Sequence, residues 1–529
     1  MLDLLFTNAK IIDGTGKEAY IGSLGVENGV QKLNVSADTE AKRVIDAKGR
    51  YLAPGFIDAH SHGDLTFHKD FSMRAKLGMG VTTQVAGQCG ESIFPCSKKY
   101  LDEYHDVCTF AIDKAPKEWE DFSSMAPFLA ALERTPIALN MAEFIGHNSL
   151  RAAVMGFENR EPTAAELDEM CALVDEAMRN GALGLSSGLM YMPGCFSKFD
   201  EMKALVEVVQ KYNGIYVTHM RDEADRVTES VRETLDIARA TGVHVWISHH
   251  KVSGLANWGR SVETLKLVDE AVKEGLNVTL DQYPFPASMT GLDACFPPMY
   301  TMVGAKKLIE QMKDPAFRSV LREQMQIKSD YESTFLNAGS FHRIQVSGSE
   351  KEPAAEGLRI DDYAAKLGKD PFDVLFDLYS VNNGVINGVY YTMNEDDVMR
   401  IFMNENTVVG SDGITRTETE KTHPRAFATF PQAINFFVRE KKLLSLEACV
   451  RKMTGQTAEA FGFSKKGRIG EGLDADLVLF DYDLLKNCAT FDEPSRRCDG
   501  IQNVVVAGEM AYENGEMTAA RAGKFLPRE

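Results

Sequence analysis

Short runs of apolar residues open the chain, and similar runs close it. Near the start lie Leu4–Phe6 and Lys10–Ile12, followed by an Asp-Gly-Thr-Gly turn at 13–16. Near the end lie Asp476–Asp481 and Val504–Gly508. Runs of this length, separated by glycine and asparagine, are typical of β-strands in a small sheet. The pattern therefore predicts sheet structure at both ends of the chain.

Between these ends, short apolar strands alternate with longer amphipathic helices, of which the clearest are 164–180, 226–241 and 261–274. This alternation predicts βα units, a parallel sheet and an α/β fold. Eight such units close into a barrel, for which about 250 residues suffice; a doubly wound open sheet is the alternative. Sheet-like sequence at both termini favours a (β/α)8 TIM-type barrel, because such ends can meet in one small β-sandwich domain.

The expected organisation is a small β-sandwich domain from residues 1–53 and 465–529, and a barrel from residues 54–464. The alternation is interrupted near 286–337, which we interpret as an insertion over the mouth of the barrel. The strand ends that can be placed number one more than a barrel of eight needs, so at least one of these strands lies outside the barrel. These ends lie near His60, Cys89, Glu143, Ser186, His219, His249, Asp281, Ser347 and Asp412.

Charge and composition restrict the partners. The formal net charge is −19, whereas nucleic acids and anionic membranes select basic surfaces. No segment reaches the roughly 18 consecutive apolar residues of a membrane span, and the first residues do not resemble a signal peptide. The cysteines form no CxxC pair, which fits reduced thiols. We expect a cytoplasmic protein that binds a small molecule, with no nucleic-acid or membrane partner; homo-oligomer formation stays open.

Histidines and one aspartate follow the predicted strands. His60 and His62 are separated by one residue and therefore project from the same face of a strand. His219 and His249 each close an apolar strand, and Asp412 follows another. Because the carboxyl ends of barrel strands meet at one face, these side chains would share a site. Neutral imidazole and carboxylate suit zinc, so the sequence predicts a metal-dependent enzyme.

Several longer motifs surround these residues and occur in a fixed order along the chain. They are Pro54–His62, Gly80–Thr83, Gly87–Gly90, Gly146–Arg151, Gly184–Tyr191, Thr218–Arg221, Ser248–Lys251, Gly410–Gly413, His423–Arg425 and Gly467–Gly472 with Ala475–Val478. In this order the chain resembles the amidohydrolase superfamily and, within it, the D-aminoacylase (N-acyl-D-amino-acid deacylase) family. The resemblance covers essentially the whole chain. The His-x-His pair alone would be a weak signal, whereas the ordered set is specific.

The resemblance implies that Cys89 is a metal ligand. Many members of the superfamily bridge two metals with a carboxylated lysine, whereas this family has a cysteine at the position of Cys89. A thiolate suits zinc, and the metal keeps it deprotonated. The tighter zinc would rest on Cys89, His219 and His249. A second, weaker metal position would be completed by His60, His62 and Asp412.

Two residues leave the ligand set open. Cys96 is the alternative to Cys89 as the thiol ligand. Glu143 stands at a strand end where this family is not expected to carry a carboxylate. It would serve either as a further metal ligand or bridge, or as the partner of a cation beside the site.

The resemblance also implies the groups that hold the substrate. An acyl amino acid carries a carboxylate, which arginine binds in a bidentate manner and lysine binds as a point charge. The implied anchors are Lys251, Tyr283 and Arg425, with Tyr191 nearby and Ser288 as a weaker candidate.

The predicted reaction is zinc-dependent hydrolysis of the amide bond of an N-acyl amino acid, by resemblance an N-acyl-D-amino acid, to a carboxylate and a free amino acid. Asp412 would act first as a base towards the attacking water and then as an acid towards the leaving nitrogen. One alternative is an amidohydrolase that acts on a cyclic amide or an unusual dipeptide. The other is a metal-free, non-catalytic barrel scaffold, which the complete set of strand-end ligands disfavours.

Overall fold

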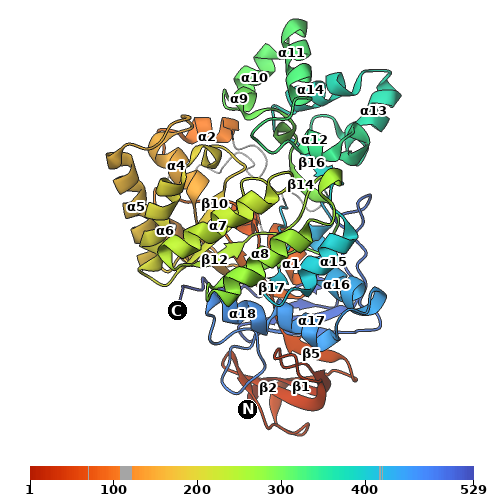
Figure 1. Cartoon of the computed structure of the whole chain (residues 1–529). Helices are drawn as coiled ribbons and strands as arrows, with labels where there is room; N and C mark the ends of the chain where they lie inside the picture. Colours follow the sequence, from red (N-terminus) through yellow and green to blue (C-terminus); the bar gives the residue numbers. More distant parts are fainter. Residues whose placement is uncertain (70, 108–121, 416–418, 420) are drawn as a thin grey trace.

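The computed structural model shows a barrel, a sheet at one end and a helical unit at the other (Figure 1). The structure describes residues 1–69, 71–107, 122–415, 419 and 421–529. No helix within these ranges is both long and apolar enough to cross a membrane.

The barrel is built from two parallel ladders of six and three strands. In ladder order they are β17 (Thr407–Val409), β13 (Val278–Gln282), β12 (His244–Ile247), β11 (Ile215–His219), β10 (Gly184–Gly188) and β9 (Ile145–Gly146), and then β6 (Phe56–Asp58), β7 (Val81–Ala86) and β8 (Asn140–Glu143). Because β8 and β9 are two halves of one strand on either side of Phe144, the ladders supply the positions of a (β/α)8 barrel. The Ala59 amide donates to the Val409 carbonyl at 3.2 Å and joins the two ladders. The predicted fold class is confirmed.

Helices follow the barrel strands and cover the outside of the barrel. They are α1 (Phe71–Leu77), α2 (Leu101–Val107), α3 (Met125–Arg134), α4 (His147–Met155), α5 (Ala164–Arg179), α6 (Phe199–Gln210), α7 (Val227–Thr241), α8 (Ser261–Lys273), α15 (Glu395–Met403), α16 (Arg425–Ala433), α17 (Leu446–Met453) and α18 (Gly455–Phe461). The helices α5 to α8 pack side by side on one flank (Figure 1). A capping box between Thr163 and Glu166 begins α5, and Gly242 ends α7 in the left-handed conformation. The three helices expected from periodicity are therefore present with nearly the expected bounds.

The insertion forms a separate unit with its own hydrophobic core, which runs from Leu292 to Tyr390. Its antiparallel sheet has the order β14 (Ser288–Gly291), β16 (Asn387–Tyr390) and β15 (Ile344–Ser347). Its helices are α9 (Pro298–Thr301), α10 (Ala305–Gln311), α11 (Pro315–Met325), α12 (Thr334–Ala338), α13 (Ile360–Leu367) and α14 (Pro371–Val381). The unit extends well beyond the expected range of 286–337. The strand that ends at Ser347 is the extra strand of the sequence analysis, and it pairs in this sheet and not in the barrel.

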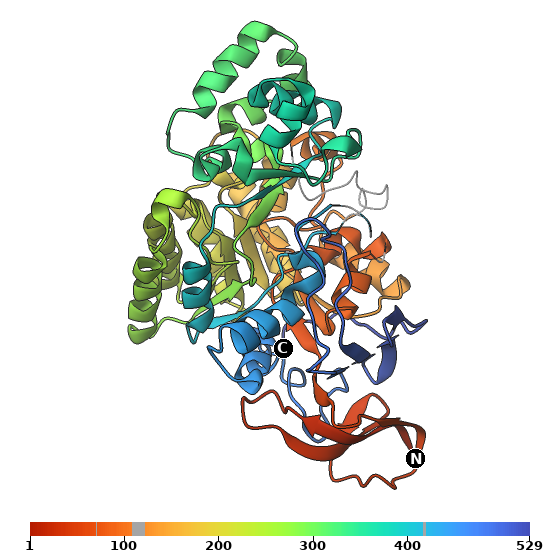
Figure 2. The ribbon, with the colours of Figure 1, turned by 90° about the vertical axis from the view of Figure 1, so that its right-hand side faces the viewer.

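Strands from both termini form one further sheet. Its order is β21 (Glu516–Met517), β20 (Glu509–Glu513), β19 (Ile501–Val506), β18 (Leu477–Phe480), β5 (Tyr51–Pro54), β1 (Leu2–Ile11), β2 (Tyr20–Glu27) and β3 (Val30–Lys32), with β4 (Ala41–Asp46) paired to β1. The strand β5 joins the two ends, because it pairs with β1 on one side and β18 on the other. Figure 2 shows this sheet at the foot of the molecule, opposite the insertion. The last residues leave the sheet, and the Leu526 amide donates to the Met141 carbonyl at the barrel.

Candidate active site

The strand ends that carry the predicted ligands turn sharply inward. Cys89, His249 and Asp412 follow β7, β12 and β17, and all three have left-handed backbone, with φ of 56°, 34° and 50°. Such a conformation is uncommon for residues other than glycine and clusters at functional sites. The side chains of these three residues and of His60 and His219 are buried. The turns therefore bring residues from separate strands into one enclosed site.

The donor atoms of the predicted ligands form two groups that share Cys89. His60, His62, Cys89 and Asp412 have donor atoms within 4.8 Å of one another, and so do Cys89, His219 and His249. The Cys89 sulfur lies 3.3 Å from Nε2 of His60 and 3.3 Å from Nε2 of His249. Each of the two groups could therefore hold a metal ion, and Cys89 would be a ligand in either.

The chemistry of the donors fits zinc. Among the described residues, neither ring nitrogen of the buried His219 has a hydrogen-bond partner. Burial holds the pKa of His219 and of His249 well below the usual value, so both imidazoles are neutral and can donate a lone pair. Burial raises the pKa of the Cys89 thiol, and a bound zinc ion would reverse this effect. A divalent metal ion would give these buried donor atoms the partner that they lack.

Asp281 contacts two of the histidines, through the ring of His60 and the backbone amide of His249. Its carboxylate lies 3.3 Å from Nδ1 of His60 and accepts the backbone amide of His249 at 2.9 Å. The indole of Trp246 donates to the same carboxylate at 2.8 Å. An outer carboxylate of this kind fixes the ring orientation of a metal-ligating histidine. Asp281 was visible in the sequence only as a strand end, with no signal for this role.

Asp412 lies between the histidines and a cation. Its Oδ1 is 3.3 Å from Nε2 of His62 and 3.6 Å from Nε2 of His60, whereas its Oδ2 is 2.8 Å from Nη1 of Arg425. Burial alone would raise the pKa of Asp412. The charge of Arg425 and the hydrogen bond to His62 outweigh burial and hold this pKa well below its usual range. Asp412 is therefore ionised, as a proton acceptor must be.

A buried lysine fixes the loop that carries Asp412. Lys76 of α1 donates to Asp58 at 2.5 Å and to the Ser411 hydroxyl at 2.6 Å. Asp58 also accepts the Ser411 amide at 2.7 Å. This network joins β6, which leads to His60, to the residue before Asp412. The sequence contained Lys76 only as one charge in a helix, so its position could not be predicted.

The predicted substrate anchors line a single cavity at this site. Lys251 donates to both carboxylate oxygens of Glu223, at 2.9 and 2.7 Å, and its Nζ lies 2.6 Å from Nδ1 of His249. The ring of Tyr283 lies under both cations, with its centroid 6.0 Å from Nζ of Lys251 and 4.7 Å from Cζ of Arg425. Tyr191 and Ser288 line the same cavity. So do five of the metal-donor residues, which are His62, Cys89, His219, His249 and Asp412.

Comparison with known proteins agrees with this geometry. The model of the amidohydrolase family matches residues 43–512. The chain belongs to the amidohydrolase family. It is 34% identical to D-aminoacylase from Alcaligenes xylosoxydans xylosoxydans, over 99% of this chain and 98% of that protein. It is also 34% identical to N-acyl-D-aspartate deacylase from the same organism, over 99% of this chain and 95% of that protein.

Solved structures place the chain in the D-aminoacylase branch of the amidohydrolases. An N-acyl-D-glutamate deacylase from Bordetella bronchiseptica, complexed with zinc and a phosphonate mimic of the tetrahedral intermediate, has a TM-score of 0.83 and 32% identity over the whole of both chains. A D-aminoacylase with a binuclear metal centre has a TM-score of 0.84 and 33% identity, also over the whole of both chains. The predicted family is confirmed.

Glu143 lies outside both donor groups of this amidohydrolase. Its carboxylate is buried and has no hydrogen-bond partner among the described residues. Burial, and then the neighbouring carboxylate of Asp64, raise the pKa of Glu143 well above its usual value. The structure places an acid beside Glu143, whereas the sequence analysis weighed a metal or a cation. Its role as a ligand stays a prediction.

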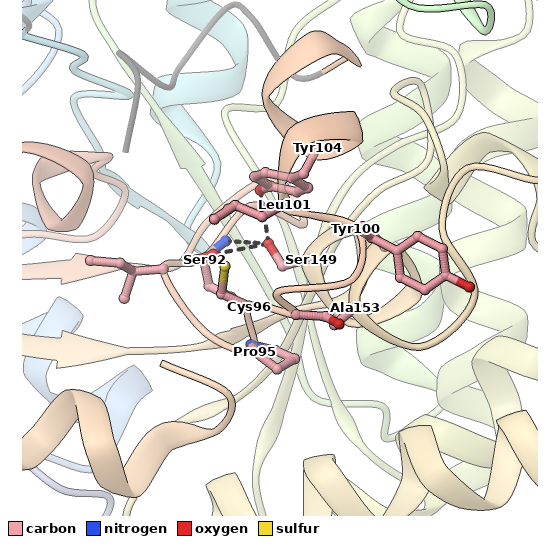
Figure 3. Close-up of a pocket in the computed structure, with 11 residues that line it drawn as sticks. Ser92, Pro95, Cys96, Tyr100, Leu101, Tyr104, Ser149 and Ala153 are labelled. Carbon is pink, nitrogen blue, oxygen red and sulfur yellow. Dashed lines mark hydrogen bonds between the residues drawn. The ribbon is translucent and has the colours of Figure 1, made fainter. Parts of the chain in front are cut away.

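Cys96 also lies outside both donor groups. It lines a different pocket between α2 and α4, with Ser92, Pro95, Tyr100 and Ser149 (Figure 3). In this pocket the Ser92 amide donates to the Ser149 hydroxyl at 3.0 Å. Of the two thiols that the sequence offered, only Cys89 faces the histidines.

Proposed function

We propose that this amidohydrolase cleaves the amide bond of N-acyl-D-amino acids in a zinc-dependent reaction that yields a carboxylate and a free amino acid. The observation that carries the proposal is one cavity in which two metal-donor groups, an ionised aspartate and two buried cations meet. The names of the similar D-aminoacylase and N-acyl-D-aspartate deacylase support the same substrate class.

Cys89, His219 and His249 would hold the tighter zinc, because neutral imidazole and thiolate are preferred zinc ligands. His60, His62 and Asp412 would complete the weaker position. Zinc bound at these positions would lower the pKa of a water molecule and polarise the acyl carbonyl of the substrate.

Asp412 moves the protons. Its ionised carboxylate, which belongs to the donor group of His60, His62 and Cys89, accepts a proton from the attacking water. It then delivers this proton to the nitrogen of the scissile amide, so that the amino acid leaves as a neutral amine. Arg425 and His62 contact different oxygens of Asp412 and keep the carboxylate turned towards the cavity.

Arg425 and Lys251 would bind the α-carboxylate of the substrate. Arg425 is buried; its Nη1 pairs with Asp412 at 2.8 Å, and its Nε donates no hydrogen bond to any described residue. A buried guanidinium with a free donor is suited to a carboxylate. Tyr283 lies under both cations, and Ser288 lines the same wall.

Tyr191 is suited to contact the acyl group. Its ring packs edge-on against His219, with 4.7 Å between the centroids. Burial raises the pKa of its hydroxyl well above the usual value, so the hydroxyl stays protonated and can donate to the acyl oxygen.

We further propose that the protein works in a reducing, cytoplasmic setting, because a centre built on the Cys89 thiolate requires this thiol to stay unoxidised. A small-molecule substrate is sufficient for the activity. Size-exclusion chromatography with light scattering would test whether copies of the chain form a homo-oligomer.

The experiment that tests the proposal incubates zinc-loaded enzyme with separate pools of N-acetyl-D- and N-acetyl-L-amino acids and measures released amine. Amine should appear in the D pool, disappear after chelation and return when zinc is added. Silence in both pools would contradict the proposal and favour a cyclic amide or unusual dipeptide as substrate.

A further inference from the structure

His423 is a buried histidine that lies outside both metal-donor groups. It stands two residues before α16, and three aromatic rings pack around its own. These rings belong to Tyr283, Phe285 and Phe491, with centroids 5.9, 5.3 and 5.1 Å from that of His423. Both ring nitrogens of His423 nevertheless have hydrogen-bond partners. A buried polar group that is fully paired in an apolar setting favours one specific arrangement of its partners.

The partners of the His423 ring determine which nitrogen carries its proton. The backbone N–H of Arg425 donates to Nδ1 at 3.0 Å, so Nδ1 accepts and carries no proton. Burial, and then the charge of Arg425, hold the pKa of His423 well below its usual value, so the ring is neutral. The proton therefore lies on Nε2, which donates to the Ala287 carbonyl at 3.0 Å.

The hydrogen bond at Nδ1 caps the helix that carries Arg425. Arg425 is the first residue of α16, and the amides in the first turn of a helix have no partner within that helix. The His423 ring supplies the missing acceptor for the Arg425 amide. This bond fixes the start of α16, from which the Arg425 side chain reaches Asp412 and the cavity.

The hydrogen bond at Nε2 ties the same segment to the insertion. Its acceptor, the carbonyl of Ala287, directly precedes β14. Nη2 of Arg425 donates to the carbonyl of Met289 in that strand at 3.3 Å. Ser288, which lines the cavity, lies between these two carbonyl groups in the chain. His423 and Arg425 therefore connect the barrel to the base of the insertion on either side of Ser288.

We propose that His423 is a positioning residue for substrate binding, whose ring holds the Arg425 amide and the strand of Ser288 so that Arg425 faces the α-carboxylate of the substrate. The inference rests on the proposed deacylase activity, in which Arg425 binds this carboxylate. His423 is not among the described residues that line the cavity, so it acts through Arg425. Its replacement should therefore weaken substrate binding more than it slows the chemical step.

Three variants of the zinc-loaded enzyme separate the two hydrogen bonds of His423. His423→Asn keeps an acceptor oxygen near the position of Nδ1, His423→Gln keeps an amide donor near that of Nε2, and His423→Leu keeps neither. The kcat and KM of each are measured on the N-acetyl-D-amino acid that the wild type cleaves fastest. We expect KM to rise by about tenfold or more in the Leu and Gln variants, which lose the bond to the Arg425 amide. It should stay within about threefold of the wild type in His423→Asn, and kcat should change less than KM.

A purely structural role of His423 predicts a different result. Phe285→Leu is the matched control, because it loosens the packing around the ring and leaves both hydrogen bonds of His423 in place. It should lower the free energy of unfolding in urea without raising KM. An unchanged KM in folded His423→Leu would overturn the inference. So would a KM no lower in His423→Asn than in His423→Gln, and this second comparison decides even if His423→Leu does not fold.

A double variant tests whether His423 acts through Arg425. In an Arg425→Lys background, His423→Gln should raise KM by no more than about twofold, because the guanidinium that His423 positions is already absent. An equal increase of KM in both backgrounds would overturn the inference and leave the deacylase activity intact. If the wild type released no amine from any N-acetyl-D-amino acid, the proposed function itself would be overturned, and the inference with it.

Discussion

Nη1 of Arg425 lies 2.8 Å from Oδ2 of Asp412, and both side chains are buried. In the proposed reaction one residue of this pair binds the substrate and the other transfers protons. The cation that would bind the substrate carboxylate also holds the pKa of the proposed proton carrier well below its usual range. Substrate binding and proton transfer are therefore expected to change together when either residue is replaced.

Arg425→Lys should lower kcat/KM by about 10- to 100-fold on N-acyl amino acids, because charge-assisted hydrogen bonds to a carboxylate are lost. A weaker ion pair also lets the pKa of Asp412 rise, so the acidic limb of the kcat profile should move to higher pH. Steady-state kinetics across pH check both effects.

The matched control for Arg425 is a substrate that lacks the α-carboxylate, such as an N-acyl amine. With this substrate the acidic limb of the kcat profile should still move to higher pH. The loss of kcat/KM that comes from weaker binding of the α-carboxylate should be absent. An unmoved limb with both substrates would show that Arg425 does not control the ionisation of Asp412.

Cys89→Ser should deplete both metal positions, because Cys89 belongs to both donor groups. His62→Ala should spare the tighter zinc, since His62 belongs to one group only. Zinc content after dialysis and thiolate-to-metal absorption of the cobalt-substituted enzyme measure the difference. Cys96→Ser is the matched control and should bind zinc as the wild type does. Full zinc content in Cys89→Ser would contradict the shared-thiolate geometry.

Lys76→Met should lower the free energy of unfolding by about 3–5 kcal/mol, because it leaves the buried Asp58 carboxylate without its cation. The double variant Lys76→Met with Asp58→Asn should lose less, since no uncompensated charge remains. Urea denaturation of the wild type, both single variants and the double variant completes the cycle. Losses that simply add would show that the two residues are not coupled.

His244 makes the stability of the barrel sensitive to acid. Burial lowers the pKa of this histidine, at the start of β12, from 6.5 to about 4. Between these values the unfolded chain takes up the proton first, so stability falls as pH drops from about 6.5 towards 4. For this partly buried residue we expect a loss of about 1–2 kcal/mol between pH 7 and pH 5.

Urea denaturation at pH 7 and pH 5, with His244→Gln as the non-titrating control, measures the contribution of His244. The variant should show a smaller difference in stability between the two pH values. An identical difference in both proteins would exclude His244 as a source of the acid sensitivity.

Most of the site residues that the sequence could predict lie at strand ends. His60, His219, His249 and Asp412 each follow an apolar run, and a parallel barrel brings the carboxyl ends of its strands to one face. The position of Cys89 came from the family resemblance alone, since an isolated cysteine has no local signature. The structure then placed this cysteine between the two donor groups.

Residues that act through tertiary contacts could not be predicted. Lys76, Glu223 and Asp281 are charged residues with nothing unusual in their neighbours along the chain, and their roles arise from partners on other elements. The strand ending at Ser347 resembled a barrel strand because a short apolar run does not show whether its partner is parallel or antiparallel.

Proton transfer by Asp412 at a zinc site is the step on which the proposed hydrolysis of N-acyl-D-amino acids depends. The most direct test measures amine release from N-acetyl-D-glutamine in a single turnover, with wild type and Asp412→Asn at equal, measured zinc content. Asp412→Asn is expected to retain the tighter zinc, which would rest on Cys89, His219 and His249, and to slow amine release by about 10²–10⁴-fold. Release by the zinc-loaded variant at close to the wild-type rate would contradict a role of Asp412 in proton transfer.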